Sequence, residues 1–151
     1  MTTIIELLEE DHQQVKSLLD DIKSTGDDAV RSRRDKFKQI QEALVIHTRF
    51  EEEKFYPRAR ALTGMDEEVD DDLEEHDEAK RMLDEISETD PGDAEWMEMI
   101  EELDEALRHH ISDEEEQLFP ATRQAMETEE AETLGKEYAR MKKRASAQAA
   151  E

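Results

Sequence analysis

The sequence contains no cysteine among its 151 residues. Disulfides, thiolate zinc sites and iron–sulfur clusters are therefore excluded, and any metal must be held by histidine nitrogens and carboxylate oxygens. Long apolar runs are also missing, since the longest covers four residues, Ala43 to Ile46, and a membrane-spanning helix needs about 20. The N-terminus, MTTIIELLEEDH, has neither a basic start nor a cleavage site. We therefore expect a cytoplasmic protein with no membrane partner.

Basic residues are scarce, at 20 against 44 acidic residues, and the formal net charge is -24. Nucleic acid is excluded as the default partner because its phosphates would be repelled. The same acid excess keeps a protein soluble at high ionic strength, so a salt-loving source is plausible. Hydrophobic residues make up only 35% of the chain and charged residues 42%, values that approach those of disordered proteins. The periodicity of the apolar residues decides between order and disorder.

Four segments carry core-type residues at alternating spacings of three and four, the pattern of a helix seam. These seams are Ile5, Leu8, His12, Val15, Leu19 and Ile22; Phe37, Ile40, Leu44, His47 and Glu51; Val69, Asp72, His76, Ala79, Leu83 and Ile86; and Ile100, Leu103, Leu107, His110 and Glu114. Helix-breaking stretches at 24–28, 62–66 and 88–93 separate them. The prediction is an all-α protein, an antiparallel up-down four-helix bundle over residues 1–128. Residues 129–151 should form a short, basic C-terminal helical tail with Gly135 as its weak point.

The chain also contains an internal repeat. HTRFEEEKFYP (47–57) recurs as HISDEEEQLFP (110–120) at an offset of 63, and residues 11–25 resemble residues 75–89 at an offset of 64. One helical hairpin therefore occurs twice, which predicts an approximate two-fold axis within the bundle. Pro57 and Pro120 close the repeated phrases and should kink or loosen the last turns of their helices.

The seams also carry four histidines and two glutamates where apolar residues are expected. Burying an ionised carboxylate costs several kcal/mol unless it is paired or ligated, and a metal cluster is the simplest common partner. A histidine and the glutamate four residues later share one helix face. Two metals about 3.5–4 Å apart, with both glutamates bridging, would satisfy the whole set. The predicted ligands, which suit non-haem iron better than manganese or zinc, are His12, His47, Glu51, His76, His110 and Glu114.

Other residues near these motifs have simpler interpretations. His109 with Asp113 matches the same spacing, but His109 falls off the seam. The remaining repeated glutamates are expected on the solvated face: Glu52, Glu53, Glu115 and Glu116. The aromatic residues are expected to pack in the core, although one could wall the metal pocket and Tyr56 could hydrogen-bond a bound ligand.

His12, His47-x-x-x-Glu51, His76 and His110-x-x-x-Glu114 resemble the hemerythrin-like, HHE cation-binding family over roughly residues 5–125. The resemblance implies an antiparallel four-helix bundle holding an oxo- or hydroxo-bridged di-iron centre that handles dioxygen, peroxide, nitric oxide or iron itself. By position, His12 and His47 would bind one iron and His76 and His110 the other, with both glutamates bridging.

The resemblance is incomplete at two positions. Dioxygen carriers of the family have a further histidine where this chain has Asp72, which is therefore a possible additional ligand or a hydrogen-bond acceptor. The carriers also end the last motif with aspartate five residues after the histidine, whereas here Glu114 follows at four. Both differences make the site more symmetric. They favour catalase-like peroxide disproportionation or another reactive-oxygen role over reversible dioxygen carriage.

Three functions remain open from the sequence. The first is a di-iron protein acting on dioxygen or peroxide, with no catalytic residue besides the metal ligands. The second is an iron, oxygen or nitric oxide sensor, or an iron buffer, without turnover. The third is a metal-free acidic interaction bundle. The four seams satisfy one another within one chain, so a monomer is sufficient.

Overall fold

The computed structural model describes residues 2–150, and it is helical apart from short connections, with no strand in that range. The all-helical prediction is therefore confirmed. Two short π-helical segments, η1 and η2, continue α2 and α5. The elements are α1 (Ile4–Lys23), α2 (Val30–Phe50), η1 (Glu51–Phe55), α3 (Tyr56–Thr63), α4 (Asp66–Ser87), α5 (Ala94–Asp113), η2 (Glu114–Leu118), α6 (Phe119–Ala125) and α7 (Thr128–Ala150).

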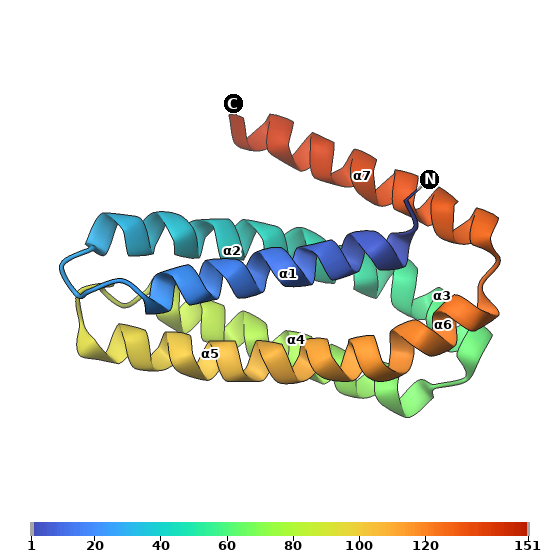
Figure 1. Ribbon diagram of the computed structural model, residues 1–151, viewed down its shortest axis with the longest axis horizontal. Coiled ribbons are helices and arrows are strands. Elements are labelled where there is room, and N and C mark those ends of the chain that lie inside the picture. The colour runs from blue at the N-terminus through green and yellow to red at the C-terminus, as the bar shows by residue number, and fades with distance from the viewer. Residues whose placement is uncertain (1, 151) are drawn as a thin grey trace.

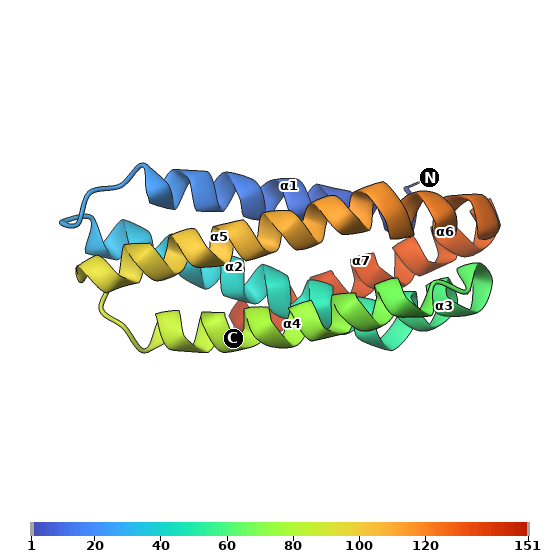
Figure 2. The same ribbon diagram turned by 90° about the horizontal axis from the view of Figure 1, so that it is seen from below.

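The four long helices α1, α2, α4 and α5 lie lengthwise beside one another, and the chain doubles back at each connection (Figures 1 and 2). Helix α1 packs against α2 and α5, and α4 packs against α5. Helix α7 lies along α1 and α2 on the outside of this group. The repeated hairpins, α1–α2 and α4–α5, therefore face each other.

Local chemistry explains the start of α1 and the ends of two further helices. The side chain of Thr3 caps α1 by accepting a hydrogen bond from the backbone of Glu6 at 3.3 Å. Gly64 ends α3 with a φ of 70°, a left-handed conformation that glycine adopts without a Cβ clash. Pro91 and Gly92 fall between α4 and α5, where no helix continues. The predicted breaks therefore lie between the observed helices.

The two prolines sit beside π-helical turns instead of ending their helices. In η1 the backbone N–H of Tyr56 bonds the carbonyl of Glu51, five residues earlier. In η2 the N–H of Phe119 bonds the carbonyl of Glu114 in the same way. An extra residue in the turn gives the ring of the following proline room beside a carbonyl that it would otherwise strike. The chain therefore stays helical past both prolines, with α3 following η1 and α6 following η2.

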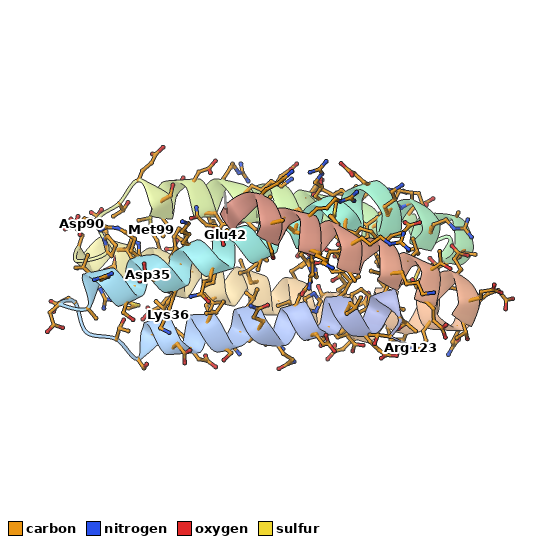
Figure 3. The ribbon with its side chains drawn as sticks, turned by 90° about the horizontal axis from the view of Figure 1, so that it is seen from above. Asp35, Lys36, Glu42, Asp90, Met99 and Arg123 are labelled. Carbon is orange, nitrogen blue, oxygen red and sulfur yellow. The ribbon has the colours of Figure 1, made fainter. Side chains whose placement is uncertain are left out.

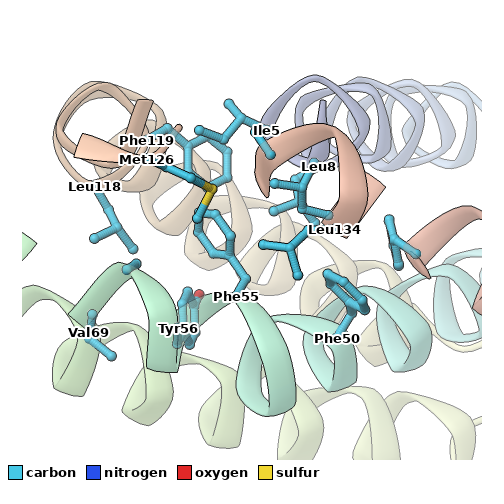
Figure 4. Packing of buried hydrophobic residues seen from close by; sticks show 14 residues of the cluster. Ile5, Leu8, Phe50, Phe55, Tyr56, Val69, Leu118, Phe119, Met126 and Leu134 are labelled. Carbon is cyan, nitrogen blue, oxygen red and sulfur yellow. The ribbon is translucent and has the colours of Figure 1, made fainter. Parts of the chain in front are cut away.

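Two apolar clusters fill the interior at opposite ends of the long helices. Figure 4 shows the cluster near α3, α6 and α7, where Phe55 packs edge-to-face on Phe119 at 5.6 Å between ring centroids. The other cluster lies toward the 24–29 and 88–93 connections and contains Trp96 and Phe37. The predicted seams are buried except at Leu44 and Ala79, which are half-buried. The polar seam residues lie between the two clusters.

Charged side chains project from the outer faces of the helices; Figure 3 labels Asp35, Lys36, Glu42 and Arg123 among them. None of the helices within residues 2–150 combines the length and the apolar character needed to cross a membrane. The charge excess is therefore carried mainly on the solvated surface.

Helix α7 runs unbroken through Gly135, and this glycine is buried. A Cβ built on it would lie 2.6 Å from the carbonyl oxygen of Thr2. Gly135 is therefore a point of close approach between α7 and the N-terminal backbone, and the expectation of a weak point was wrong. The boundary between residues 1–128 and 129–151 stays a prediction.

Candidate metal centre

All six predicted ligands meet in one layer between the two apolar clusters. Each is at most 7% exposed. They come from six different elements: His12 from α1, His47 from α2, Glu51 from η1, His76 from α4, His110 from α5 and Glu114 from η2. The sequence placed them on four separate seams, and the fold brings them together.

The six residues divide into two groups, each with two histidines and one glutamate. One group is His12, His47 and Glu114, and the other is Glu51, His76 and His110. Within each group the candidate ligand atoms lie within 4.8 Å of one another. The histidine rings of each pair have their centroids 5.0 Å apart. The grouping of His12 with His47 and of His76 with His110 is the one that the family resemblance implied.

Both glutamates lie between the two histidine pairs. Oε1 of Glu51 is 3.1 Å from Nε2 of His47 and also 3.1 Å from Nε2 of His76. The carboxylate of Glu114 places Oε1 3.2 Å from Nε2 of His12 and Oε2 3.9 Å from Nε2 of His110. Each carboxylate therefore reaches a histidine of both groups, the arrangement that a bridging ligand requires.

Several polar atoms of this layer are buried without a hydrogen bond. They are Nε2 of His12, both carboxylate oxygens of Glu51, Nε2 of His110 and Oε1 of Glu114. Leaving such atoms unsatisfied costs about 1–3 kcal/mol each, and more for charged groups. They all point into the space that the two groups surround. A pair of cations there would satisfy them together.

The opposite nitrogen of each histidine, Nδ1, bonds a carboxylate outside this space. The four pairs follow the internal repeat. Glu115 and Glu52, which each follow a predicted glutamate ligand, bond to His12 and His76. Asp11 and Glu75, which each precede a predicted histidine ligand, bond to His47 and His110. The Nδ1–O distances are 2.7 Å, 2.8 Å, 2.9 Å and 2.9 Å in that order. Such acceptors fix the tautomer that turns Nε2 toward a metal.

Glu52 and Glu115 were expected on the solvated face, and that expectation was wrong. Glu53 and Glu116, by contrast, are exposed as predicted. Each misplaced glutamate directly follows a ligand glutamate in a π-helical segment. The repeat could have singled them out, because both copies carry glutamate at that position, but glutamate is too common here for that signal to stand out.

Asp11 links the centre to the C-terminal helix. Besides accepting from His47, its carboxylate bonds the hydroxyl of Tyr138 and the ammonium of Lys142, both on α7. Tyr138 is fully buried, with its ring 4.8 Å from that of Phe50. Glu75, which is equivalent to Asp11 in the repeat, has no hydrogen bond to α7 among the described residues. This contact breaks the two-fold symmetry, and the internal repeat does not predict it.

Asp72 lies beside the second group. Its Oδ1 is 3.4 Å from Nδ1 of His110, the nitrogen that faces away from the enclosed space. It is 4% exposed, and its burial raises the pKa of its carboxyl despite the nearby imidazole of His110. A grouping of Asp72 with His110 and Glu114 is also close enough for shared ligation. Contact with Nδ1 favours the acceptor role of the two that the sequence left open.

Two aromatic rings close the glutamate side of the centre. Tyr56 and Phe119 are equivalent in the repeat, and each stacks on a histidine, His76 at 5.4 Å and His12 at 5.7 Å. The π-helical turns bring them there, because the extra residue per turn places a side chain five positions on above the ligand glutamate. The Tyr56 hydroxyl also donates to Oε2 of Glu114 at 2.6 Å. Tyr56 therefore holds a candidate ligand as well as packing.

The electrostatics of the layer differ between the two glutamates. Burial disfavours charge on His47, but the charge of Glu51 and the hydrogen bond to Asp11 outweigh it and raise the pKa of this imidazole to about 10. Burial likewise opposes charge on Glu51, but His47 and His76 hold the pKa of its carboxyl well below the usual range. Burial and the charge of Glu51 raise the pKa of Glu114. Cations entering the layer would therefore displace protons.

His109 is outside the centre, as its place off the seam predicted. Its side chain is 67% exposed, and its Nε2 lies 3.2 Å from Asp113 on the surface. Periodicity thus separated the buried histidine of the HH pair from the exposed one.

Comparisons with known proteins agree with this geometry. The model of the family described as Hemerythrin HHE cation binding domain matches residues 3–122. A DNA nickase of Nostoc sp. is 28% identical over 135 residues, which are 89% of this chain but only 38% of the nickase. An uncharacterised hemerythrin-like protein of Schizosaccharomyces pombe is 28% identical over 145 residues, 95% of this chain and 70% of that protein.

One solved structure shares the fold. It is the crystal structure of a hemerythrin HHE cation binding domain-containing protein from Mycobacterium kansasii, with a TM-score of 0.82 and 24% sequence identity. The match covers 97% of this chain and 90% of that one. The similarity therefore includes α7 as well as the four long helices.

Proposed function

This chain belongs to the hemerythrin HHE cation binding domain family, and on that premise we propose that its six clustered residues hold two non-haem iron ions that act on dioxygen or peroxide. His12 and His47 would hold one iron and His76 and His110 the other. Glu51 and Glu114 would bridge them. The scaffold proposed for this centre is an antiparallel four-helix bundle with an internal two-fold repeat.

The observation that carries the proposal is the set of buried polar atoms without hydrogen bonds that converge on one space. A metal-free interaction bundle has no reason to keep such atoms, because apolar side chains of similar volume would stabilise it more. Nitrogen and carboxylate oxygen donors with room for exchangeable ligands suit non-haem iron, and suit manganese or zinc less well.

The residues around the ligands have distinct tasks. The carboxylates on Nδ1 of the four histidines orient the imidazoles and make them better donors. The hydroxyl of Tyr56 orients the carboxylate of Glu114 by donating to Oε2, and Oε1 has no hydrogen bond. Phe119 and the surrounding apolar cluster exclude water from the glutamate side. When bound, the two irons would supply the electrons that dioxygen or peroxide chemistry needs.

The two ligand groups have the same composition, two histidines and one glutamate each. A symmetric centre of this kind suits catalase-like disproportionation of peroxide, in which two molecules of peroxide give dioxygen and two of water. Reversible dioxygen carriage would need two unlike metal positions.

A second candidate is a sensor of iron, oxygen or nitric oxide, or an iron buffer, without turnover. The contact of Asp11 with α7 favours it, because any movement of His47 on metal binding would pass to the C-terminal helix. A DNA substrate is not proposed, although one relative is named a DNA nickase. The chain spans under half of that relative, and its net charge of -24 would repel phosphates.

Metal stoichiometry tests the proposal first. Protein loaded with ferrous iron and desalted should contain two irons per chain and develop near-ultraviolet absorption in air. Glu51→Ala should lose one or both irons, whereas the matched change Glu53→Ala, at an exposed glutamate of the same π-helical turn, should lose none. One iron or none in the unmodified protein, or a preference for zinc, would refute the di-iron centre.

An oxygen electrode then separates the two candidates. Iron-loaded protein should release dioxygen from added peroxide, and the Glu51→Ala variant should not. Two irons per chain without gas release, together with a large rise in melting temperature on iron binding, would leave the sensor or buffer.

A further inference from the structure

A cavity of about 720 Å³ lies on the histidine side of the centre, between α2 and α4. Helix α1 packs closely on α2 and α5, and α4 packs closely on α5, whereas α2 and α4 pack less closely on each other. His12, His47, His76 and His110 form one wall of the cavity, whereas neither bridging glutamate lines it. The cavity therefore reaches the centre from the side opposite Tyr56 and Phe119.

Small side chains create this space at repeated positions. Ala43 and Ala106 are equivalent in the two hairpins, and each lies one helical turn before a ligand histidine. Ala79 faces them from α4, and all three line the cavity. A larger apolar residue at any of them would reduce the space. This also explains why Ala79 and the adjacent Leu44 are only half-buried although they lie on core seams.

The cavity is much larger than dioxygen or peroxide requires. Each of those molecules occupies roughly the volume of one or two waters, about 30–50 Å³. A volume of about 720 Å³ falls within the range of about 300–1,000 Å³ for sites that enclose small organic molecules. Its inner wall is mostly aliphatic, with Leu44, Met82 and Leu83 beside the alanines. Such a wall favours an apolar occupant, because water there lacks hydrogen-bond partners.

The charges around the opening of the cavity disfavour binding of anions. Its two basic residues, Arg49 and Lys80, are paired with Glu53 and Glu52 at 3.2 Å each. Three more carboxylates line the opening without a counter-ion among the ion pairs of the described residues: Glu78, Glu102 and Glu105. A ligand with a carboxylate, sulfonate or phosphate group would therefore meet net repulsion.

We propose that this cavity binds an uncharged, largely apolar organic molecule whose inner end lies against the four histidine rings. The geometry supports binding with or without iron, because the walls come from the helices. The site is therefore distinct from the proposed iron centre, although a molecule bound there would lie beside it.

Two fluorescent probes with a similar ring system test the proposal. N-phenyl-1-naphthylamine is uncharged, and 8-anilino-1-naphthalenesulfonate carries a sulfonate. We expect saturable binding of one uncharged probe per full-length chain, with at least about tenfold weaker binding of the anionic probe. No saturable binding of the uncharged probe, or equal binding of both, would overturn the proposal.

Cavity-filling variants locate the binding. Ala79→Trp should weaken binding of the uncharged probe at least about tenfold, whereas Ala139→Trp, at an exposed position of α7, should leave it unchanged. Circular dichroism checks folding, and if Ala79→Trp does not fold, Ala106→Leu is judged by the same criterion. Unchanged binding in a folded cavity-filling variant would overturn the proposal.

The iron content of the same samples keeps this test separate from the proposed function. Ala79→Trp changes a wall and no ligand, so it should still bind two irons per chain. If the metal-free protein binds the probe but no iron, the proposed function fails and the cavity proposal stands. If the protein binds two irons but no probe, the cavity proposal fails and the iron centre stands.

Discussion

The close backbone approach at Gly135 predicts that Gly135→Ala destabilises the protein, although helix propensity alone would predict stabilisation. Alanine is favoured over glycine inside a helix by about 1 kcal/mol, so Gly135→Ala would stabilise a helix that packed on nothing. In this structure the new Cβ would lie 2.6 Å from the carbonyl oxygen of Thr2, 3.2 Å from the carbonyl carbon of Thr3 and 3.3 Å from the amide nitrogen of Ile4. All three neighbours are backbone atoms. Helix α7 would therefore have to retreat from the N-terminus of α1.

Such a retreat has a definite cost. Overpacking of this kind costs about 1–3 kcal/mol, and it would also loosen the buried contacts of Leu134 and Tyr138. After the propensity gain of about 1 kcal/mol is subtracted, we expect Gly135→Ala to lower the free energy of unfolding by up to about 2 kcal/mol. Urea unfolding followed by circular dichroism measures the change.

A matched control and a local probe complete the test. Thr133→Ala, two residues away on the exposed face of α7, should change stability by less than about 0.5 kcal/mol. Limited trypsin digestion should cut the Gly135→Ala protein faster after Arg140, because α7 is more often detached. Stabilisation by about 1 kcal/mol would show that the two backbones are not in contact and would refute the reasoning.

Three further predictions concern the centre. In the metal-free protein the pKa of His47 is raised from 6.5 to about 10, so its contribution to stability is complete below pH 6.5 and is lost as the pH rises through about 10. The urea midpoint should therefore fall over that range, and a slope that stays the same in His47→Gln would contradict this assignment. Tyr56→Phe removes the donor to Glu114 and should destabilise the metal-free protein by about 1–3 kcal/mol while two irons still bind; unchanged urea stability would argue against that hydrogen bond. Tyr138→Phe frees Asp11 and should weaken one of the two metals about tenfold toward a chelator, and equal loss of both would argue against an effect through His47 alone.

The sequence predicted the helices, and the structure brings the six predicted ligands together, for a physical reason. A residue that must face the interior of a helical protein recurs every three or four positions, so burial leaves a periodic signal whether the residue is leucine or histidine. His110 was separated from His109 in this way. The internal repeat added a second constraint, because His12 and His76 have no glutamate partner four residues later. Their equivalence in the repeat and their places on the seams marked them as candidate ligands, and the family resemblance supplied their pairing with His47 and His110.

What the sequence missed depends on distances between helices. Leu44 and Ala79 continue their seams, but no seam reveals that α2 and α4 pack less closely on each other. Glu52 and Glu115 resemble the many solvated glutamates of an acidic chain, and only the π-helical turns bring them to histidines. Pro57 and Pro120 predicted an irregular helix, but they did not predict that the irregularity would be a π-helical turn. The contact of α7 with Asp11 lies outside the repeat, so symmetry could not predict it.

The division of ligands between the hairpins affects how the protein is made. Each group takes two histidines from one hairpin and its glutamate from the other. The first hairpin leaves the ribosome with His12, His47 and Glu51 while the second is still being translated, at about 5–20 residues per second. A nascent chain would therefore present only part of each ligand group until Glu114 has emerged and both hairpins have closed on each other. A product truncated before Glu114 would lack one glutamate of the proposed centre and could not form the paired site.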